Sequence, residues 1–489
     1  MKILSGTGDC KSAGAGLRVY GYFKDDVGTI AKAMEHGIAK HIGSQLRGPK
    51  NGPIRFLSER GVWYSFIKLD DGKGPTAESF RRFGANAVKE AGSVSAKDVA
   101  AILPPGHGVP ADDAAGAVVQ GAVLGIYNYS ELKTSDSDGT DGFGGKGRSM
   151  SICRLDGARI AQGTIDRARL VAEATNEARR LADAPSNMMT PAIFTDIVGA
   201  KARKEGIKVR VLDKSRLEAM GWGAFLGVAR GSFEPPKVLV LEYSGAKGPK
   251  RYAVVGKGIT FDSGGISIKP SSGMEDMKFD IAGAAAVAMT TILAARLTMP
   301  LNIVAVMPLT ENMPGGRAQK PGDVVKTLSG KTVEIISTDA EGRMILADAL
   351  SYVVKTYRPE AVIDLATLTG ACVVALGSEA SGIMGTDDGL VDALIDAGEQ
   401  SGDRLWKLPL WDDYKDLLKS DVADMKNAGS RWAGAIQGGI FLKEFVQDAK
   451  WAHVDIAGTA YLDKPRPYFR KGATGAGVRL LIKFFEGLH

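Results

Sequence analysis

Ser337-Thr338-Asp339-Ala340-Glu341-Gly342-Arg343 brings two carboxylates and a guanidinium together where a strand is expected to end. The preceding segment, Thr332 to Ile336, predicts that strand. If the chain stays extended, residues two apart point the same way, so Asp339 and Glu341 share a face and can reach one pair of cations. Apolar residues then recur at helical spacing from Leu346 to Tyr357, which indicates a strand-to-helix turn, the place where open α/β sheets bind ligands. The alternative is an acidic, solvated turn.

A second charged segment lies upstream. Tyr252 to Gly265 predicts an apolar strand that runs into a glycine-rich turn carrying Lys257 and Asp262, and Lys269 and Asp280 follow. Each residue also has a purely structural explanation: a surface amine for Lys257, a turn-former for Asp262, and the N-cap of the next apolar helix for Asp280.

Together these segments closely resemble the leucyl aminopeptidase (cytosol aminopeptidase) family of dinuclear metallopeptidases. The resemblance covers roughly the last two thirds of the chain, from about Ala168 onward, whereas the first 160 or so residues show no motif that matches on its own. The segments that carry it are Val255–Pro270, Met277–Asp280, Thr338–Arg343, Ala366–Ala371 and Trp451–Gly458.

The resemblance implies a centre of two divalent metal ions, Zn²⁺ or Mn²⁺, with Mg²⁺ or Co²⁺ as alternatives. One ion would be held by Asp262, by Asp339 through its carboxylate and its backbone carbonyl, and by Glu341. The other would take Lys257, Asp262, Asp280 and Glu341. Asp262 and Glu341 would therefore bridge the two ions, which share a nucleophilic water or hydroxide.

The same resemblance implies two catalytic residues, with Lys269 polarising the scissile carbonyl and Arg343 holding a bicarbonate that acts as general base. It also implies contacts with the peptide substrate from Met277, Thr367, Leu368 and Gly370. The family usually has Asn where this chain has Ser337, and often Leu at Met344. Neither residue is a ligand, but Ser337 can change a hydrogen bond next to one.

The residue types suit two-metal hydrolysis. Two cations about 3.5 to 4 Å apart can activate a water, polarise a carbonyl and stabilise the charge of a tetrahedral intermediate. Ligands that are all oxygen apart from one amine accept Mn²⁺, Mg²⁺ or Co²⁺ as well as Zn²⁺. Only a neutral lysine amine can bind a metal, and deprotonating it at pH 7 costs roughly 4.6 kcal/mol. Without metal, we expect Lys257 to be protonated and paired with a carboxylate.

Other hydrolase classes fit the sequence less well. The five histidines include no H-E-x-x-H pair, which excludes a helical zinc protease site. Phe261 to Gly265 contains an Asp-Ser-Gly-Gly run, so a serine-type hydrolase using Ser263 is an alternative. The segment, however, lies between a parallel-type strand and a helix, and no G-x-S-x-G elbow is present. We expect His453 and Asp455 to be structural.

Length and composition predict a globular α/β protein with two domains. The chain has 489 residues, a length that exceeds what one hydrophobic core usually serves. Of these residues 44% are hydrophobic and 24% are charged. We expect residues 1–160 to form a smaller N-terminal α/β domain with an assembly or regulatory role. Residues 161–489 should form the catalytic domain, with a connecting helix at about 166–184 and a mixed, mostly parallel sheet flanked by helices.

Apolar runs locate individual strands. In the N-terminal part, Val62–Ile67 and Gly121–Tyr127 alternate with a possible helix at Thr76–Ala91. In the C-terminal part, strands are predicted at Lys237–Tyr243, Tyr252–Val255, Asn302–Met307 and Ala361–Asp364.

Location and partners are less constrained. Three widely spaced cysteines make a disulfide framework unexpected and favour the cytoplasm. The longest uncharged stretches are too short and polar for a convincing membrane span. The family resemblance suggests a homohexamer. A net charge of +6 permits DNA binding as a second, architectural role. The densest basic stretch for it is Arg47, Lys50, Arg55 and Arg60.

Overall fold

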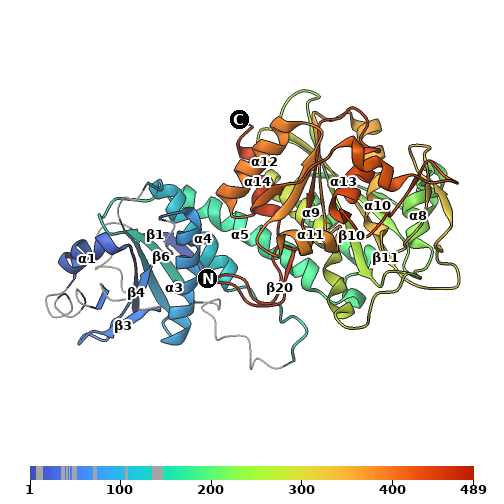
Figure 1. Cartoon of the computed structure of the whole chain (residues 1–489). Helices are drawn as coiled ribbons and strands as arrows, with labels where there is room; N and C mark the ends of the chain where they lie inside the picture. The colour runs from blue at the N-terminus through green and yellow to red at the C-terminus, as the bar shows by residue number, and fades with distance from the viewer. Residues whose placement is uncertain are drawn as a thin grey trace. The chain divides into compact units, whose positions relative to one another are not determined.

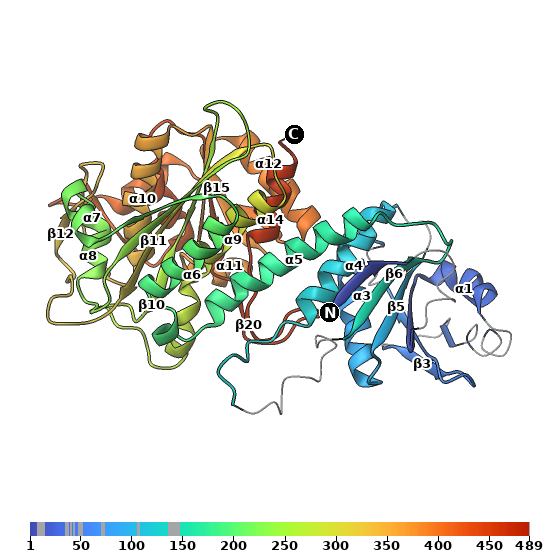
Figure 2. The same cartoon turned by 180° about the vertical axis from the view of Figure 1, so that it is seen from behind.

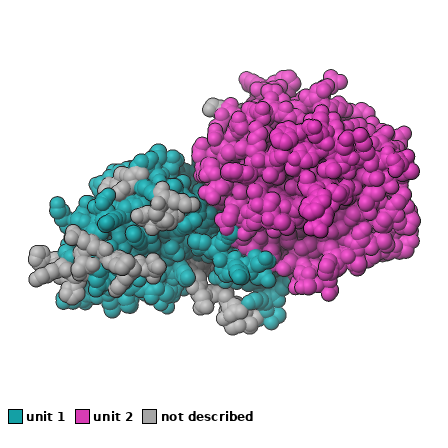
Figure 3. Space-filling model, viewed as in Figure 1, with its two compact units in different colours: residues 1–173, 463–471 teal, residues 174–462, 472–489 magenta. Residues whose placement is uncertain are grey.

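The chain folds into two compact α/β units. The computed structural model describes residues 1–6, 15–34, 39, 42, 45–46, 52–69, 74–104, 108–134 and 147–488. Unit 1 comprises Met1–Glu173 with Asp463–Lys471, and unit 2 comprises Ala174–Leu462 with Gly472–His489 (Figure 3). The division falls inside helix α5 (Gln162–Asp183), whereas the boundary expected from the sequence lies at residue 160, in front of this helix.

Unit 1 contains a six-stranded sheet in the order β1-β6-β5-β2-β4-β3, in which only the β3–β4 pair is antiparallel (Figure 1). Its strands are β1 (Lys2–Ser5), β2 (Leu17–Tyr22), β3 (Ile54–Leu57), β4 (Trp63–Lys68), β5 (Asp98–Leu103) and β6 (Ser149–Arg154). Its helices include α1 (Val27–Ala33), α3 (Ala77–Ser93) and α4 (Ala111–Gly125). Helices α3 and α4 lie side by side and bury the apolar face of β2, β5 and β6 (Figure 2).

One apolar run of unit 1 differs from its prediction. Val62–Ile67 forms β4, but Gly121–Tyr127, expected as a strand, is mostly the end of α4. Gly121 lets α4 pack closely against α3, because a Cβ at this position would lie 1.7 Å from the carbonyl oxygen of Arg81 in α3. Periodicity alone does not distinguish a fully apolar segment of a buried helix from a buried strand.

Unit 2 is built on a nine-stranded mixed sheet. Its order is β16-β15-β18-β14-β9-β11-β8-β7, with β10 also pairing β11. The central part of the sheet is parallel and consists of β18, β14, β9, β11 and β10. Strand β15 pairs with β18 in antiparallel orientation. Strand β8 is also antiparallel to both of its neighbours, β11 and β7. The strands are β7 (Lys208–Leu212), β8 (Lys237–Ser244), β9 (Tyr252–Gly256), β10 (Gly258–Asp262), β11 (Asn302–Asn312), β14 (Ala361–Ala366), β15 (Ser381–Gly385), β16 (Leu405–Lys407) and β18 (Trp451–Asp455).

Helices cover both faces of this sheet (Figures 1 and 2). They are α6 (Pro191–Lys204), α7 (Lys214–Met220), α8 (Gly223–Ala229), η4 (Met274–Ile281), α9 (Ala282–Arg296), α10 (Glu341–Tyr357), α11 (Gly370–Leu376), α12 (Asp388–Ser401), α13 (Gly434–Lys443) and α14 (Val478–Glu486). Short strands β12 (Val324–Lys326), β13 (Thr332–Glu334) and β17 (Met425–Lys426) form a small sheet, and β19 (Tyr461–Leu462) pairs β20 (Gly472–Ala473).

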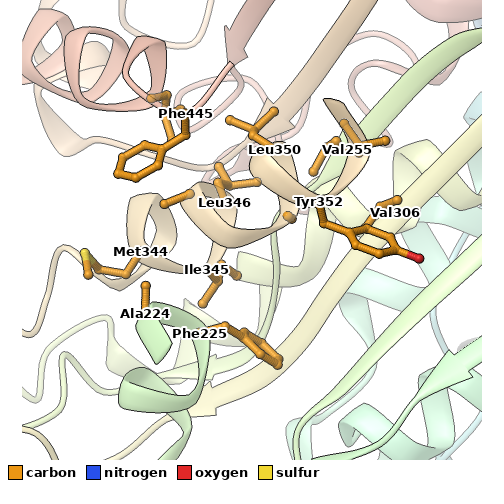
Figure 4. Close-up of a cluster of buried hydrophobic side chains, with 14 of the residues drawn as sticks. Ala224, Phe225, Val255, Val306, Met344, Ile345, Leu346, Leu350, Tyr352 and Phe445 are labelled. Carbon is orange, nitrogen blue, oxygen red and sulfur yellow. The ribbon is translucent and has the colours of Figure 1, made fainter. Parts of the chain in front are cut away.

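Helix α10 forms the centre of one hydrophobic core of unit 2. Its apolar side chains, including Ile345 and Leu346, pack on one side against α8 and on the other against the sheet face that carries Val255 and Val306 (Figure 4). Helix α9 contacts the same strands β9, β11 and β14 and is buried almost completely. The helical stretch Met274–Arg296 is long and apolar enough to cross a membrane, but 83% of its most apolar window is buried within the protein.

The described cysteines differ from each other. Cys372 is a free thiol that is 1% exposed, and burial raises its pKa to about 12, which makes it unreactive. Cys153 is disulfide-bonded, which departs from the expectation of unpaired cysteines.

Asp348, on the buried side of α10, ties this helix to two backbone segments. Its Oδ2 accepts a hydrogen bond from the Phe225 N–H at 2.9 Å, and its Oδ1 accepts one from the Leu328 N–H at 2.7 Å. Phe225 lies in the first turn of α8, where N–H groups have no acceptor within the helix. Burial raises the pKa of Asp348 to about 7, although the backbone donors act in the opposite direction.

This pKa predicts a pH-dependent stability. The pKa of Asp348 in the folded protein lies above its value of about 3.9 in the unfolded chain. At pH values between these two pKa values, Asp348 is therefore protonated in the folded protein and ionised in the unfolded chain. The stability from this group is complete below about pH 4 and is lost as the pH rises through about 7. We expect wild type to lose up to roughly 4 kcal/mol of unfolding free energy relative to Asp348→Asn across this window. Urea unfolding of both proteins at several pH values measures it, and a constant difference contradicts the prediction.

Candidate metal centre

The site lies where the central parallel strands of unit 2 end. Lys257 follows β9, Asp262 ends β10, Asn312 ends β11 and Thr367 follows β14. These strands are parallel, so their carboxyl ends meet at one edge of the sheet. The four side chains are all buried.

Two helix starts bring further carboxylates to the same edge. Asp280 lies in η4, directly before α9, and Glu341 is the first residue of α10. Glycines make the approach of α9 possible: a Cβ at Gly256 would lie 2.5 Å from the Gly283 carbonyl oxygen, and one at Gly283 would lie 2.3 Å from the Leu365 carbonyl oxygen. Helix N-termini stabilise negative charge.

Two local expectations are wrong. Strand β13 ends at Glu334, Asp339 lies in a turn and Glu341 is helical, so Asp339 and Glu341 do not share a face of an extended chain. Asp280 does not act as an N-cap of α9, since the residue in that position is Ile281. Its carboxylate instead contacts Lys257 and Thr367.

The structure gathers Asp262, Asp280 and Glu341 most closely, with one carboxylate oxygen from each within 4.8 Å of the others. The Lys257 Nζ lies between them, 2.8 Å from Asp280 Oδ2 and 2.8 Å from Glu341 Oε1, and it donates a hydrogen bond to the Thr367 carbonyl at 2.8 Å. Lys257 is paired with two carboxylates, as expected. Burial lowers its pKa, but the charges of Asp280 and Glu341 raise it by more.

Asp339 lies beside this group and is joined to it through Lys269. The Lys269 Nζ is 2.9 Å from Asp262 Oδ2 and also forms an ion pair with Asp339. The side chains of Lys269 and Asp339 are 22% and 36% exposed, so they form the solvent-facing side of the cluster.

The cluster carries more negative than positive charge, since four carboxylates face two ammonium groups. Burial raises the pKa of Asp280 to about 8; Lys257 opposes this, and repulsion from Asp262 and Glu341 adds to it. Burial likewise raises the pKa of Asp339 to about 6, together with the charges of Asp262 and Glu341. Burial also acts to raise the pKa of Glu341, but the charges of Lys257 and Lys269 hold this pKa below its usual value.

Arg343 binds a backbone carbonyl. Its Nη1 donates to the Asn427 carbonyl at 2.7 Å, while its Nε is buried without a hydrogen-bond partner. Burial lowers the pKa of Arg343 to about 10, and the charges of Glu341 and Asp455 counteract part of that effect. A buried guanidinium with an unused donor is suited to binding an anion.

The residues expected to contact substrate line the segments beside the carboxylates. The Thr367 hydroxyl donates to Asp280 Oδ1 at 2.5 Å, and the Leu368 N–H donates to Asp455 Oδ1 at 3.1 Å. Gly370 is the first residue of α11, and Met277 is partly buried in η4.

Ser263 has a structural role. Its hydroxyl donates to the Asn312 carbonyl at 2.7 Å and accepts from the Gly265 N–H at 3.2 Å. Among the described residues the one histidine is His453, which is fully buried and bonded through Nδ1 to Asp364 at 2.6 Å. Within the described part of the chain, no histidine bonds to Ser263 as the general base of a serine-type hydrolase would.

Two side chains that the sequence analysis missed connect the ligand-bearing turns. The Asn312 Nδ2 lies 2.8 Å from Asp262 Oδ1 and 3.4 Å from Glu341 Oε2. The Thr338 hydroxyl donates to the Gly264 carbonyl at 2.6 Å and accepts from the Ser267 N–H at 2.7 Å. Thr338 lies inside the Thr338–Arg343 motif. Asn312 lies in the polar end of β11, which follows the apolar run Ile303–Leu309, and polar residues at such a strand end were the available signal.

The basic stretch considered for DNA binding is described only in part, and DNA binding stays a prediction. Arg55 donates two hydrogen bonds to the buried carboxylate of Glu90, at 2.6 and 2.8 Å. Arg60 is exposed, and Arg47 and Lys50 lie outside the described residues.

Comparisons with known proteins match the chain to one protein family. A family model described as "Cytosol aminopeptidase family, catalytic domain" matches residues 176–482, and the N-terminal domain model of the same family matches residues 69–136. A "Probable cytosol aminopeptidase" of Geobacter sp. (strain M21) is 44% identical over 480 residues, 96% of each chain. One of Geobacter sulfurreducens is 47% identical over 440 residues, 88% of this chain and 86% of the relative.

A solved structure titled "Bottromycin maturation enzyme BotP in complex with Mn" is similar in fold. It superposes with a TM-score of 0.86 at 34% identity and covers 97% of this chain and 99% of its own. The two-domain α/β fold is thereby confirmed.

Gly342, the second residue of α10, makes room for Lys257. A Cβ at Gly342 would lie 2.7 Å from Lys257 Cε and 2.8 Å from its Nζ. We expect Gly342→Ala to displace the amine and leave buried carboxylates unpaired, which lowers the unfolding free energy of the metal-free protein by on the order of 2 to 4 kcal/mol.

The matched control is Gly163→Ala, at the second residue of α5, where a Cβ meets nothing within 4 Å. Alanine there should be neutral or stabilise by up to about 1 kcal/mol. Urea unfolding compares the variants, and equal stabilities for Gly342→Ala and wild type contradict the prediction.

Proposed function

The chain belongs to the cytosol aminopeptidase family, and from that premise we propose that it removes N-terminal residues from peptides, leucine and other apolar residues first, with two bound divalent cations. The observation that carries the proposal is the convergence of Lys257, Asp262, Asp280 and Glu341 at the carboxyl edge of the parallel strands.

The residues present fit such a centre. Three buried carboxylates whose oxygens lie within 4.8 Å repel one another strongly unless cations balance them. Asp280 Oδ2 is buried with no hydrogen bond and only the ion pair to Lys257. Oxygen donors with one amine suit Zn²⁺, Mn²⁺, Mg²⁺ or Co²⁺. This donor set supports metal binding and leaves the choice among these ions open.

In this proposal one ion would be held by Asp262, Glu341 and Asp339, and the other by Asp262, Glu341, Lys257 and Asp280. When bound, the two ions would supply an activated water and polarise the scissile carbonyl. Lys257 has to give up its proton to become a ligand, and its amine already lies within 2.8 Å of Asp280 and Glu341, so little movement is needed.

Lys269 and Arg343 would supply the remaining positive charge. Lys269 is the more exposed of the two lysines, so its ammonium can turn from Asp262 and Asp339 toward a substrate carbonyl. The buried, unused Nε of Arg343 supports the binding of a small anion, and bicarbonate as general base fits that position.

Substrate would be held by the segments after β14 and in η4, through Met277, Thr367, Leu368 and Gly370. Leu368 is already oriented by the hydrogen bond of its N–H to Asp455. The homohexameric assembly stays a prediction from the resemblance. The cytoplasmic location and the role of the N-terminal domain stay predictions from the sequence.

A blocked substrate tests the exopeptidase assignment. A free α-amine can be bound by the carboxylates or their cations, as the Lys257 amine is, whereas an acetylated amine has neither positive charge nor a basic lone pair. We expect leucine amide to be hydrolysed and N-acetylleucine amide to be inert, with kcat/KM lower by at least about a thousandfold. Equal turnover of both compounds contradicts an aminopeptidase.

A further inference from the structure

Asn312 occupies the space between the two central carboxylates. It is the last residue of β11 and is 2% exposed. Besides Asp262 Oδ1 at 2.8 Å and Glu341 Oε2 at 3.4 Å, its Nδ2 reaches the Thr338 carbonyl at 3.0 Å. One neutral amide therefore donates toward both acidic side chains and toward the turn that leads to Asp339.

The lysines and Asn312 contact different oxygens of these carboxylates. On Asp262, Lys269 contacts Oδ2, while Asn312 and the Gly264 N–H donate to Oδ1. On Glu341, Lys257 contacts Oε1 and Asn312 contacts Oε2. Each carboxylate is thus held from one side by Asn312, and its opposite oxygen faces a cation.

The Asn312 amide is itself fixed in place. Its backbone carbonyl accepts hydrogen bonds from the N–H and hydroxyl of Ser263, at 3.0 and 2.7 Å. The Asn312 Oδ1 lies beside Gly265. A Cβ at position 265 would be 2.8 Å from this oxygen, so only glycine leaves room for the amide. The amide nitrogen has to face the carboxylates, since an amide oxygen there would face two anions.

We propose that Asn312 is a positioning residue for the metal centre, holding Asp262 and Glu341 so that the oxygens now paired with lysines are presented to the two ions. The inference rests on the proposed function, because it assigns these carboxylates as the shared ligands. A neutral donor between two anions also reduces their repulsion before metal binds. Hydrogen bonds that orient ligands typically contribute 10- to 100-fold to metal affinity.

The test compares Asn312→Leu with Asn302→Leu. Asn302 is the first residue of the same strand, is also buried, and donates to the carbonyls of Gly248 and Lys250 at 3.2 and 2.9 Å. Both substitutions remove an amide of similar burial, but only Asn312 touches the carboxylates. After chelation and dialysis, Mn²⁺ is titrated into each protein, and free Mn²⁺ is followed by electron paramagnetic resonance.

We expect Asn312→Leu to weaken Mn²⁺ binding by about 10- to 100-fold, and Asn302→Leu to bind as wild type does, even if both unfold more easily. Wild-type affinity in Asn312→Leu, or an equal loss in both variants, overturns the positioning role. If Asn312→Leu does not fold, Asn312→Ser keeps one shorter donor and should show a smaller loss, and unchanged affinity there overturns the role. Failure of wild type to bind two Mn²⁺ per chain counts against the proposed function itself.

Discussion

Repulsion among the buried carboxylates at the carboxyl edge of the unit 2 sheet is the constraint on which the rest of the site depends. Asp262, Asp280 and Glu341 have oxygens within 4.8 Å of one another, and Asp339 adds a fourth negative charge at the solvent side. Two lysines offset only half of this charge. Burial, together with repulsion from the neighbouring carboxylates, raises the pKa values of Asp280 and Asp339, so the arrangement favours additional positive charge.

The fold holds this unfavourable arrangement by fixing every segment that carries a carboxylate. Parallel strands set the positions of Lys257 and Asp262, and the buried helix α10 sets that of Glu341. Asp348 anchors α10 to α8, and the glycines at positions 256 and 283 let α9 approach the strand ends. Strain of this kind is expected at functional sites, where charge is organised before the ligand arrives.

Much of the candidate site could be proposed from the sequence because its residues lie in short segments that carry the family resemblance. The strands before Lys257 and after Arg358 are apolar runs with clear ends, and the motif residues follow them directly. The extended conformation from Asp339 to Glu341 was wrong because period-two reasoning assumes that a strand continues, whereas β13 ends after three residues and α10 begins at Glu341. The role of Asn312 depends on contacts across 50 and 29 positions, to Asp262 and Glu341, which no local pattern encodes.

The most direct test is hydrolysis of a leucyl arylamide by the purified protein before chelation, after chelation and after return of Mn²⁺ or Zn²⁺, with metal counted per chain. The account predicts that activity disappears on chelation and returns as two ions bind to each chain. Activity that is indifferent to chelation, or that is absent with every metal, contradicts it.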